Sequence, residues 1–212
     1  MSGVEGASTN PTPDSHLVPA LCLGAVVLGV VLAAIEPRYV YLYVSENALV
    51  FVSVPWLALT YRRFRFSNAS YLALAVFFLM HEVGAHYGYN EAPVFGEWAS
   101  WGWSRNPYDR VVHAAFGLLG AVPIRELLVR KAGLRGFVAS QVTLAEIGAA
   151  SLVYELLEWA YAKAANPDAV PMFLGAQGDP WDAQKDMANA FVGGLVSCVL
   201  LWARGRPRTS AS

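Results

Sequence analysis

Four pairs of acidic or imidazole side chains stand at helical spacing in or beside the apolar stretches of this 212-residue chain. They are Glu82 with His86, Asp109 with His113, Glu155 with Glu158, and Asp182 with Asp186. Side chains three or four residues apart share one face of a helix, so each pair presents its groups to the same side. Carboxylates and imidazoles bind divalent metals and also act as general acids and bases. The pairs therefore predict either a metal centre or a proton-handling site.

The depth of these pairs predicts that they converge, because each lies near one end of its apolar stretch. A charged side chain that faces lipid at the bilayer centre costs about 2.5–3.5 kcal/mol. Several such groups on four helices must therefore face one another, water or a bound cation. We expect their polar atoms to gather in one pocket, within about 10 Å of one another. The residues expected there are His86, Asp109, His113, Glu155 and Asp186.

Three interpretations of the pairs are open. In the first, carboxylates and imidazoles hold a divalent metal (Zn, Mn or Fe), as paired Glu and His residues do in metal-binding helix bundles. The predicted metal ligands are His86, His113, Glu158, Asp182 and Asp186, and the predicted catalytic groups are Glu82, Asp109 and Glu155. In the second, the same groups form a network that fixes helix packing or relays protons. Its predicted partners are Arg110, Lys185, Tyr87, Tyr108 and Gln184. In the third, they are separate, solvated loop residues.

Other polar residues predict no further chemistry. The segment "HEVGAH" resembles the His-Glu-x-x-His zinc motif, but His81 and His86 are five residues apart and point in different directions. Cys22 and Cys198 have no neighbour at metal or redox spacing. Glu146 is nine residues from Glu155 and faces roughly the opposite way.

The elements that position the pairs are predicted to be membrane-spanning helices. The chain is 56% hydrophobic and 15% charged, whereas soluble domains carry about a quarter charged residues. Residues 17–35 contain no charged side chain, and this run is long enough to cross a hydrocarbon core of about 30 Å as a helix. The predicted spans are residues 17–35, 39–60, 68–88, 108–128, 137–162 and 183–203. We thus expect an all-α, multi-pass bundle of about six transmembrane helices at 17–204, between a disordered cytoplasmic tail (1–16) and a basic cytoplasmic tail (205–212).

The distribution of charge predicts the orientation. Ten of the 15 Lys and Arg residues follow the second, fourth and sixth spans, which places these segments and both termini in the cytoplasm. Twelve of the 16 acidic residues fall in the opposite loops or helix halves, together with three of the four histidines. An excess of acids suits a cation or proton site at the outer face.

Two further patterns concern packing and the outer loops. Asp186, Ala190, Gly193 and Ser197 form a stripe of small residues that predicts close approach of another helix to the last span. Trp98, Trp101 and Trp103 predict an interfacial aromatic belt, with a short lid over the site as the alternative. No repeat or broken helix is evident, which disfavours transport.

The motifs "HEVGAHYGY", "YDRVVH", "YELLEW" and "GDPWDAQKDM" resemble those of the YjdF-like family of uncharacterised bacterial inner-membrane proteins, over residues 20–203. The last three spans also resemble, more distantly, the VanZ-like family associated with glycopeptide resistance. That resemblance matches Asp109, Arg110 and His113 to one element, Glu155 or Glu158 to the next, and Asp186 with Gly193 to the third. Its expected Asn is replaced here by Ala190.

These observations favour two classes of function. The first is a metal-assisted enzyme at the outer leaflet, acting on a lipid or a lipid-linked envelope precursor. The second is a non-enzymatic membrane protein, either a proton- or cation-coupled transporter or an envelope-stress or resistance factor. The expected partners are membrane lipids and a lipid-linked substrate, with no nucleic acid, and the expected location is the inner membrane.

Overall fold

The computed structural model describes residues 16–93, 96, 102, 104–164 and 176–204. Within these ranges the chain forms seven α-helices and two 3₁₀ helices and no strand, which confirms the all-α class. The α-helices are α1 (Leu17–Ala33), α2 (Val40–Glu46), α3 (Ala48–Thr60), α4 (Asn68–Tyr87), α5 (Tyr108–Lys131), α6 (Gly136–Ala164) and α8 (Asp182–Arg204). The 3₁₀ helices are η1 (Tyr89–Glu91) and η5 (Ala176–Gly178). The loop tryptophans and the two predicted tails, His16 excepted, lie outside the described residues.

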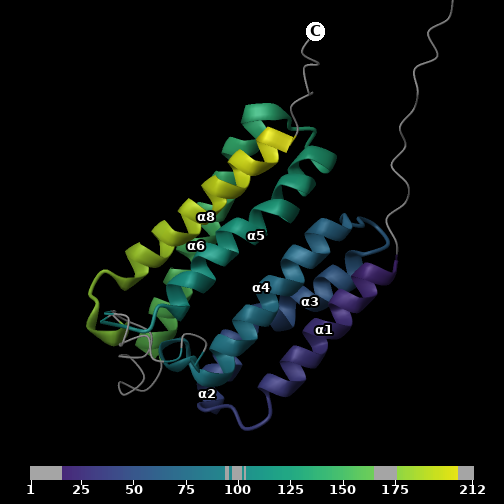
Figure 1. The fold of residues 1–212 in the computed structure, drawn as a ribbon. Helices are drawn as coiled ribbons and strands as arrows, with labels where there is room; N and C mark the ends of the chain where they lie inside the picture. Colours follow the sequence, from purple (N-terminus) through teal and green to yellow (C-terminus); the bar gives the residue numbers. More distant parts are fainter. Residues whose placement is uncertain (1–15, 94–95, 97–101, 103, 165–175, 205–212) are drawn as a thin grey trace, which may run out of the picture.

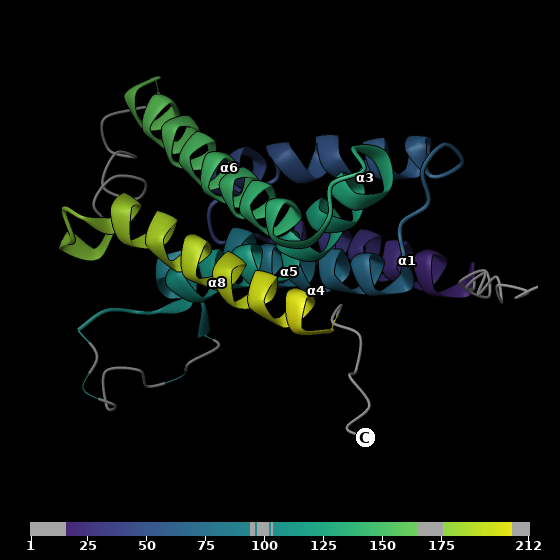
Figure 2. The same cartoon turned by 90° about the horizontal axis from the view of Figure 1, so that it is seen from above.

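The helices form two layers. Helices α1, α4, α5 and α8 pack in that order, each against the next. Seen from above in Figure 2, these four lie together, and α3 and α6 lie on one side of them. Figure 1 shows the same helices as two groups, with α1, α3 and α4 in one and α5, α6 and α8 in the other. The contact of α4 with α5 joins the two groups.

The predicted number of spans is confirmed only in part. Helices α4, α5, α6 and α8 are each long and apolar enough to cross a membrane, and α2 with α3 passes as a fifth span if the pair is taken together. Helix α1 has 17 residues, which reach about 26 Å at about 1.5 Å each. Four to five spans are therefore supported directly.

The expectation of unbroken helices is wrong for the second predicted span, because α2 and α3 meet at an angle of 41°. The break falls at Asn47, which is fully buried and whose Nδ2 donates to the Tyr43 carbonyl oxygen (3.1 Å). An Asn side chain that binds nearby backbone competes with regular helix hydrogen bonds. The sequence signal was therefore a short polar stretch, Ser45-Glu46-Asn47, in an otherwise mostly apolar run.

The distribution of polarity is that of a membrane bundle. Large apolar side chains such as Val52, Leu59 and Phe137 are 68%, 82% and 69% exposed. In contrast, Asn47, His81, Glu82, Glu155 and Asp186 are buried. An apolar exterior around a polar interior is expected where lipid, rather than water, surrounds the helices.

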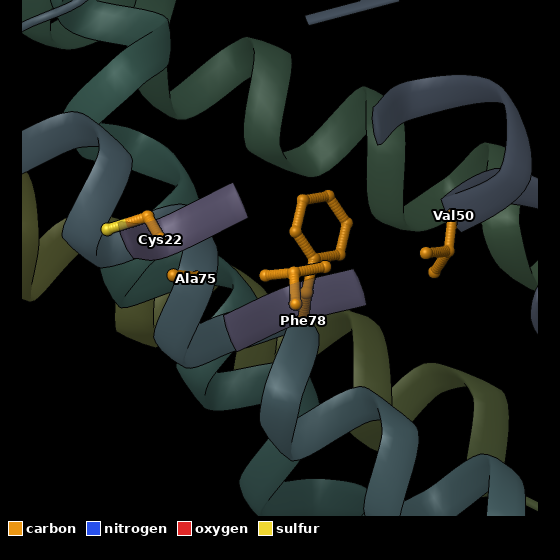
Figure 3. Close-up of a cluster of buried hydrophobic side chains, with 5 residues drawn as sticks. Cys22, Val50, Ala75 and Phe78 are labelled. Atoms are coloured by element: carbon orange, nitrogen blue, oxygen red, sulfur yellow. The ribbon is translucent and has the colours of Figure 1, made fainter. Parts of the chain in front are cut away.

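The apolar core is concentrated in the first group of helices. Figure 3 shows Cys22, Ala75, Phe78 and Val50, which come from α1, α4 and α3 and belong to one buried cluster with Val26. Ala75 and Cys22 are small, so α1 and α4 approach closely here. This cluster packs α1 and α3 against α4.

The start of α4 is fixed to α5 by one carboxylate. Glu126 accepts hydrogen bonds from the Ser67 backbone N–H (2.8 Å) and hydroxyl (2.7 Å) and from the Ser70 hydroxyl (2.5 Å). A carboxylate at a helix N-terminus satisfies free N–H groups and favours the helix dipole. Arg130 pairs with the same carboxylate and donates to the Arg65 carbonyl oxygen (2.7 Å), so these contacts connect the segment before α4 to α5.

Helices α5 and α8 touch through their backbones. A Cβ atom on Gly117 would lie 1.9 Å from the Ala190 carbonyl oxygen, and one on Gly193 would lie 2.1 Å from the Ala114 carbonyl oxygen. Only glycine permits such a distance. The small-residue stripe thus brings another helix against α8 as predicted, and Asp186, Ala190, Gly193 and Ser197 are all buried.

Candidate functional site

A cluster of acidic and imidazole groups forms where α5, α6 and α8 meet at the end of the bundle remote from Glu126. His113 on α5 lies with its Nε2 atom 3.6 Å from Asp109 Oδ1 and 3.6 Å from Glu155 Oε1. Ligand atoms of His113, Glu155 and Asp186 all lie within 4.8 Å of one another. The same holds for Asp109, Asp182 and Asp186. Three of the four predicted pairs therefore contribute to one cluster.

Two carboxylates of this cluster have polar atoms without hydrogen-bond partners. Asp186 is 2% exposed and Glu155 is 9% exposed, and Asp186 Oδ1 and Glu155 Oε1 are both buried with no donor among the described residues. Buried carboxylate oxygens normally accept hydrogen bonds, because the loss of hydration is otherwise uncompensated. The two atoms are therefore suited to a ligand that supplies positive charge or a proton.

The outer rim of the cluster is an ion-pair network. Arg105 pairs with Asp182, and both side chains are buried. Arg110 Nη2 and Lys185 Nζ lie 2.5 Å and 2.6 Å from Asp179 Oδ2. The hydrogen bond from Lys185 is the main cause that lowers the pKa of Asp179 to about 2. The stabilisation from Asp179 is therefore complete above about pH 4 and is lost as the pH falls toward 2.

This network separates the roles of the acids. Asp182 has its charge balanced by Arg105, whereas Asp186 and Glu155 have no Arg or Lys within 4 Å among the described residues. Arg110 and Lys185 were predicted as network partners, and both enter the network through Asp179. Asp179 and Arg105 were not predicted, although Asp179 precedes Asp182 by three residues and Arg105 precedes Asp109 by four, because both lie outside the predicted spans.

A cavity of about 510 Å³ lies beside the cluster. The carboxylates that line it are Glu46, Glu91, Asp109, Glu155, Glu158, Asp182 and Asp186, and the predicted partner Gln184 lines it too. The wall on α6 is formed by Leu152, Leu156 and Trp159, which are about half exposed. The cavity thus has an acidic interior and an apolar edge on the lipid-facing side of α6.

Glu82 and His86 on α4 lie apart from this cluster. His86 Nδ1 donates to the Ala33 carbonyl oxygen at the end of α1 (3.0 Å). Glu82 is 3% exposed and is near Gly29 of α1, and neither of its oxygens has a hydrogen-bond partner among the described residues. Neither residue lines the cavity. The structure therefore joins α5, α6 and α8, but not α4, in the candidate metal cluster.

Two polar contacts deeper in the bundle were not predicted. The Tyr154 hydroxyl donates to Glu46 Oε2 (2.5 Å), which links α6 to α2, and the Tyr154 ring packs edge-on against His113. The Tyr89 hydroxyl and His81 Nδ1 share a hydrogen bond of 2.6 Å. A carboxylate in an apolar span is itself a signal, so Glu46 could have been included from the sequence.

The donor set fits a divalent metal. Zinc bonds to nitrogen and carboxylate oxygen are about 2.0–2.2 Å long, so ligand atoms around one ion lie about 3–4 Å apart. His113, Glu155 and Asp186 offer three such atoms, each from a different helix, and Asp109 is a fourth donor beside His113. Inward movements of well under 1 Å at each side chain would complete the spacing.

An all-α chain with an apolar exterior, several spans and a polar interior is a multi-pass membrane protein. Residues 18–207 match the family described as "Predicted membrane protein (DUF2238)", and the chain belongs to this family. It is 38% identical over 162 residues to "Inner membrane protein YjdF" of Escherichia coli (strain K12), covering 75% of this chain and 77% of that protein. No solved structure matches. The YjdF-like resemblance is confirmed and supports a multi-pass inner-membrane location.

Proposed function

We propose that the protein is a divalent-metal-dependent enzyme at the extracytoplasmic membrane face, acting on a lipid or a lipid-linked envelope precursor. The observation that carries this is the grouping of ligand atoms of His113, Glu155 and Asp186 within 4.8 Å, with Glu155 Oε1 and Asp186 Oδ1 buried and without a hydrogen-bond partner in the part of the chain that the structure describes. A purely structural network would be expected to satisfy these oxygens.

In this proposal His113, Glu155 and Asp186 hold the metal, which would activate water or polarise a phosphoryl or carbonyl oxygen of the substrate. Asp109 lies 3.6 Å from the His113 imidazole. It is placed to orient that ring or to accept a proton. The ion pair to Arg105 keeps Asp182 as a support for the cluster and not as a primary ligand.

The shape of the cavity supports an amphipathic substrate. Its acidic interior faces α8, while Leu152, Leu156 and Trp159 border it on the side of α6 that is exposed to lipid. A polar headgroup would contact the metal that the acidic side chains hold, and acyl or isoprenoid chains would lie along α6. A soluble, fully polar substrate would leave this apolar edge unused.

The decisive experiment measures the metal content of the purified protein. We expect about one Zn, Mn or Fe ion per chain in the wild type and at least a tenfold loss in Asp186→Asn, because the change removes a charged ligand while preserving shape. Glu146→Gln is the matched control, since Glu146 is an exposed acid of α6 remote from the cluster. No stoichiometric metal, together with a melting temperature indifferent to chelator, would remove the metal-dependent proposal.

A second candidate function, a proton- or cation-coupled transporter, is favoured by the broken helix pair α2–α3. Discontinuous helices bind coupling ions in many transporters, and Glu46 and the buried Asn47 stand at this break. Reconstitution in liposomes distinguishes the candidates. A transporter would dissipate an imposed proton or cation gradient and lose this activity in Glu46→Gln, whereas the enzyme would leave the gradient intact.

The orientation within this proposal has six spans, with α1 as the first, α2–α3 as the second, and both termini in the cytoplasm. In a background lacking Cys22 and Cys198, we expect Trp181→Cys to react with an impermeant thiol reagent in intact cells and Arg63→Cys to resist it. The physical reason is the excess of Lys and Arg beside residue 63. Both positions are exposed, so the reverse pattern would invert the topology.

A further inference from the structure

An apolar groove of about 400 Å³ lies between α1, α3 and α4, at the end of the bundle opposite to the acidic cluster. Its lining is almost wholly aliphatic and aromatic, and includes Cys22, Val26, Leu57, Leu74 and Phe78. Cys22 and Phe78, shown in Figure 3, are buried parts of the same core cluster that forms its floor. No residue of the candidate metal site lines this groove.

The groove begins at a polar mouth. Arg65 Nη1 donates to His16 Nε2 (3.2 Å), so the other ring nitrogen, Nδ1, carries the hydrogen in its contact with the Tyr61 hydroxyl (2.7 Å). This leaves the hydroxyl hydrogen of Tyr61 to donate elsewhere. Arg65 Nη2 is buried and has no hydrogen-bond partner among the described residues. The Tyr61 hydroxyl therefore offers a neutral donor at the mouth, and the Arg65 guanidinium, which contacts His16 but does not itself line the groove, places positive charge next to it.

The dimensions match one leaflet of a bilayer. The groove runs along α1 from His16 to Val26, a rise of about 15 Å at about 1.5 Å per residue. Half of a hydrocarbon core is also about 15 Å. An acyl chain lying in the groove would thus start at the membrane interface and end near the bilayer centre.

Charge selects the headgroup. Arg62 and Arg63 are exposed beside Arg65, and none of the described residues that line the groove is acidic. Basic pockets between helices at a membrane surface recognise anionic lipids, and each Lys or Arg near the surface contributes about fivefold in affinity. We infer that this groove binds an anionic phospholipid, with its phosphate at Tyr61 and Arg65 and one acyl chain between α1, α3 and α4.

The test uses the full-length protein in mild detergent, titrated with phosphatidylglycerol or with phosphatidylcholine of the same acyl chains. Bound lipid is counted by native mass spectrometry, and the melting temperature is followed in parallel. We expect phosphatidylglycerol to bind at least fivefold more tightly than phosphatidylcholine. Arg65→Gln should remove most of this preference, and Arg63→Gln, the same charge change at an exposed neighbour, should lower it by a clearly smaller factor.

A second variant tests the groove itself. Ala20 lines it and is exposed, so Ala20→Trp fills the space without altering the buried core and should lower phosphatidylglycerol binding at least fivefold. Equal binding of the two lipids, equal losses in Arg65→Gln and Arg63→Gln, or full binding in Ala20→Trp would each overturn the inference. So would a dimer that Ala20→Trp dissociates, because the groove would then be filled by a second copy.

Discussion

Asp182→Ala is expected to lower the free energy of unfolding by about 3–5 kcal/mol, because it leaves the buried guanidinium of Arg105 without its main counter-charge. Asp179 Oδ2, 3.7 Å from Arg105 Nη1, retains part of the compensation and places the loss at the lower end of that range. The measurement is reversible unfolding in mixed micelles, followed by circular dichroism.

The matched control is the exposed pair of Arg38 and Glu91, whose side chains are 56% and 33% exposed. Glu91→Gln should change stability by less than about 1 kcal/mol, since exposed ion pairs contribute little. The double variant Arg105→Met with Asp182→Leu should recover most of the loss, because an apolar pair of similar volume needs no charge compensation. An Asp182→Ala protein as stable as Glu91→Gln would show that Arg105 is solvated and that the rim network does not hold the cluster.

The helices could be predicted closely from the sequence, whereas their contacts could not. Apolar runs interrupted by charges mark where a chain enters and leaves lipid, and the observed α4 (Asn68–Tyr87) and α6 (Gly136–Ala164) differ by at most two residues at either end from the predicted spans. The bend at Asn47 was not predicted, because the short polar stretch Ser45-Glu46-Asn47 changes the mean hydropathy of the span little, whereas the Asn47 side chain binds the backbone locally.

The candidate site illustrates the same limit. Helical spacing identifies which side chains share a face, so Asp109 with His113 and Asp182 with Asp186 were found. Helical spacing does not identify which other helix packs against the face that carries a pair. The face of α4 that carries Glu82 and His86 meets α1, through the Ala33 carbonyl oxygen, and not α5. Arg105 and Asp179 lie in connecting segments, where no periodicity reports on their direction.

The register of α5 against α8 connects the fold to the site. Gly117 lies against Ala190, and His113 and Asp186 stand one turn before them on α5 and α8, respectively. The backbone contact therefore sets how close the imidazole comes to the carboxylate. The depth of the acidic residues along their helices does not by itself determine the distance between the His113 imidazole and the Asp186 carboxylate.

Gly117→Ala is accordingly expected to destabilise the protein and to disrupt the cluster together. Its new Cβ would lie 1.9 Å from the Ala190 carbonyl oxygen. Backbone on both sides cannot yield as a flexible side chain would, so α5 and α8 must separate, at a cost of about 1–3 kcal/mol. Gly148→Ala is the control, because its Cβ would meet only Phe191 Cδ2 at 3.8 Å and alanine favours the helix by up to about 1 kcal/mol.

The free energy of unfolding, measured in micelles, should thus fall in Gly117→Ala and rise slightly in Gly148→Ala. Under the metal proposal, Gly117→Ala should also lose the ion at temperatures where it remains folded, since a shift of about 1 Å separates His113 from Asp186. Wild-type stability in Gly117→Ala would mean that the two helices do not touch at this register.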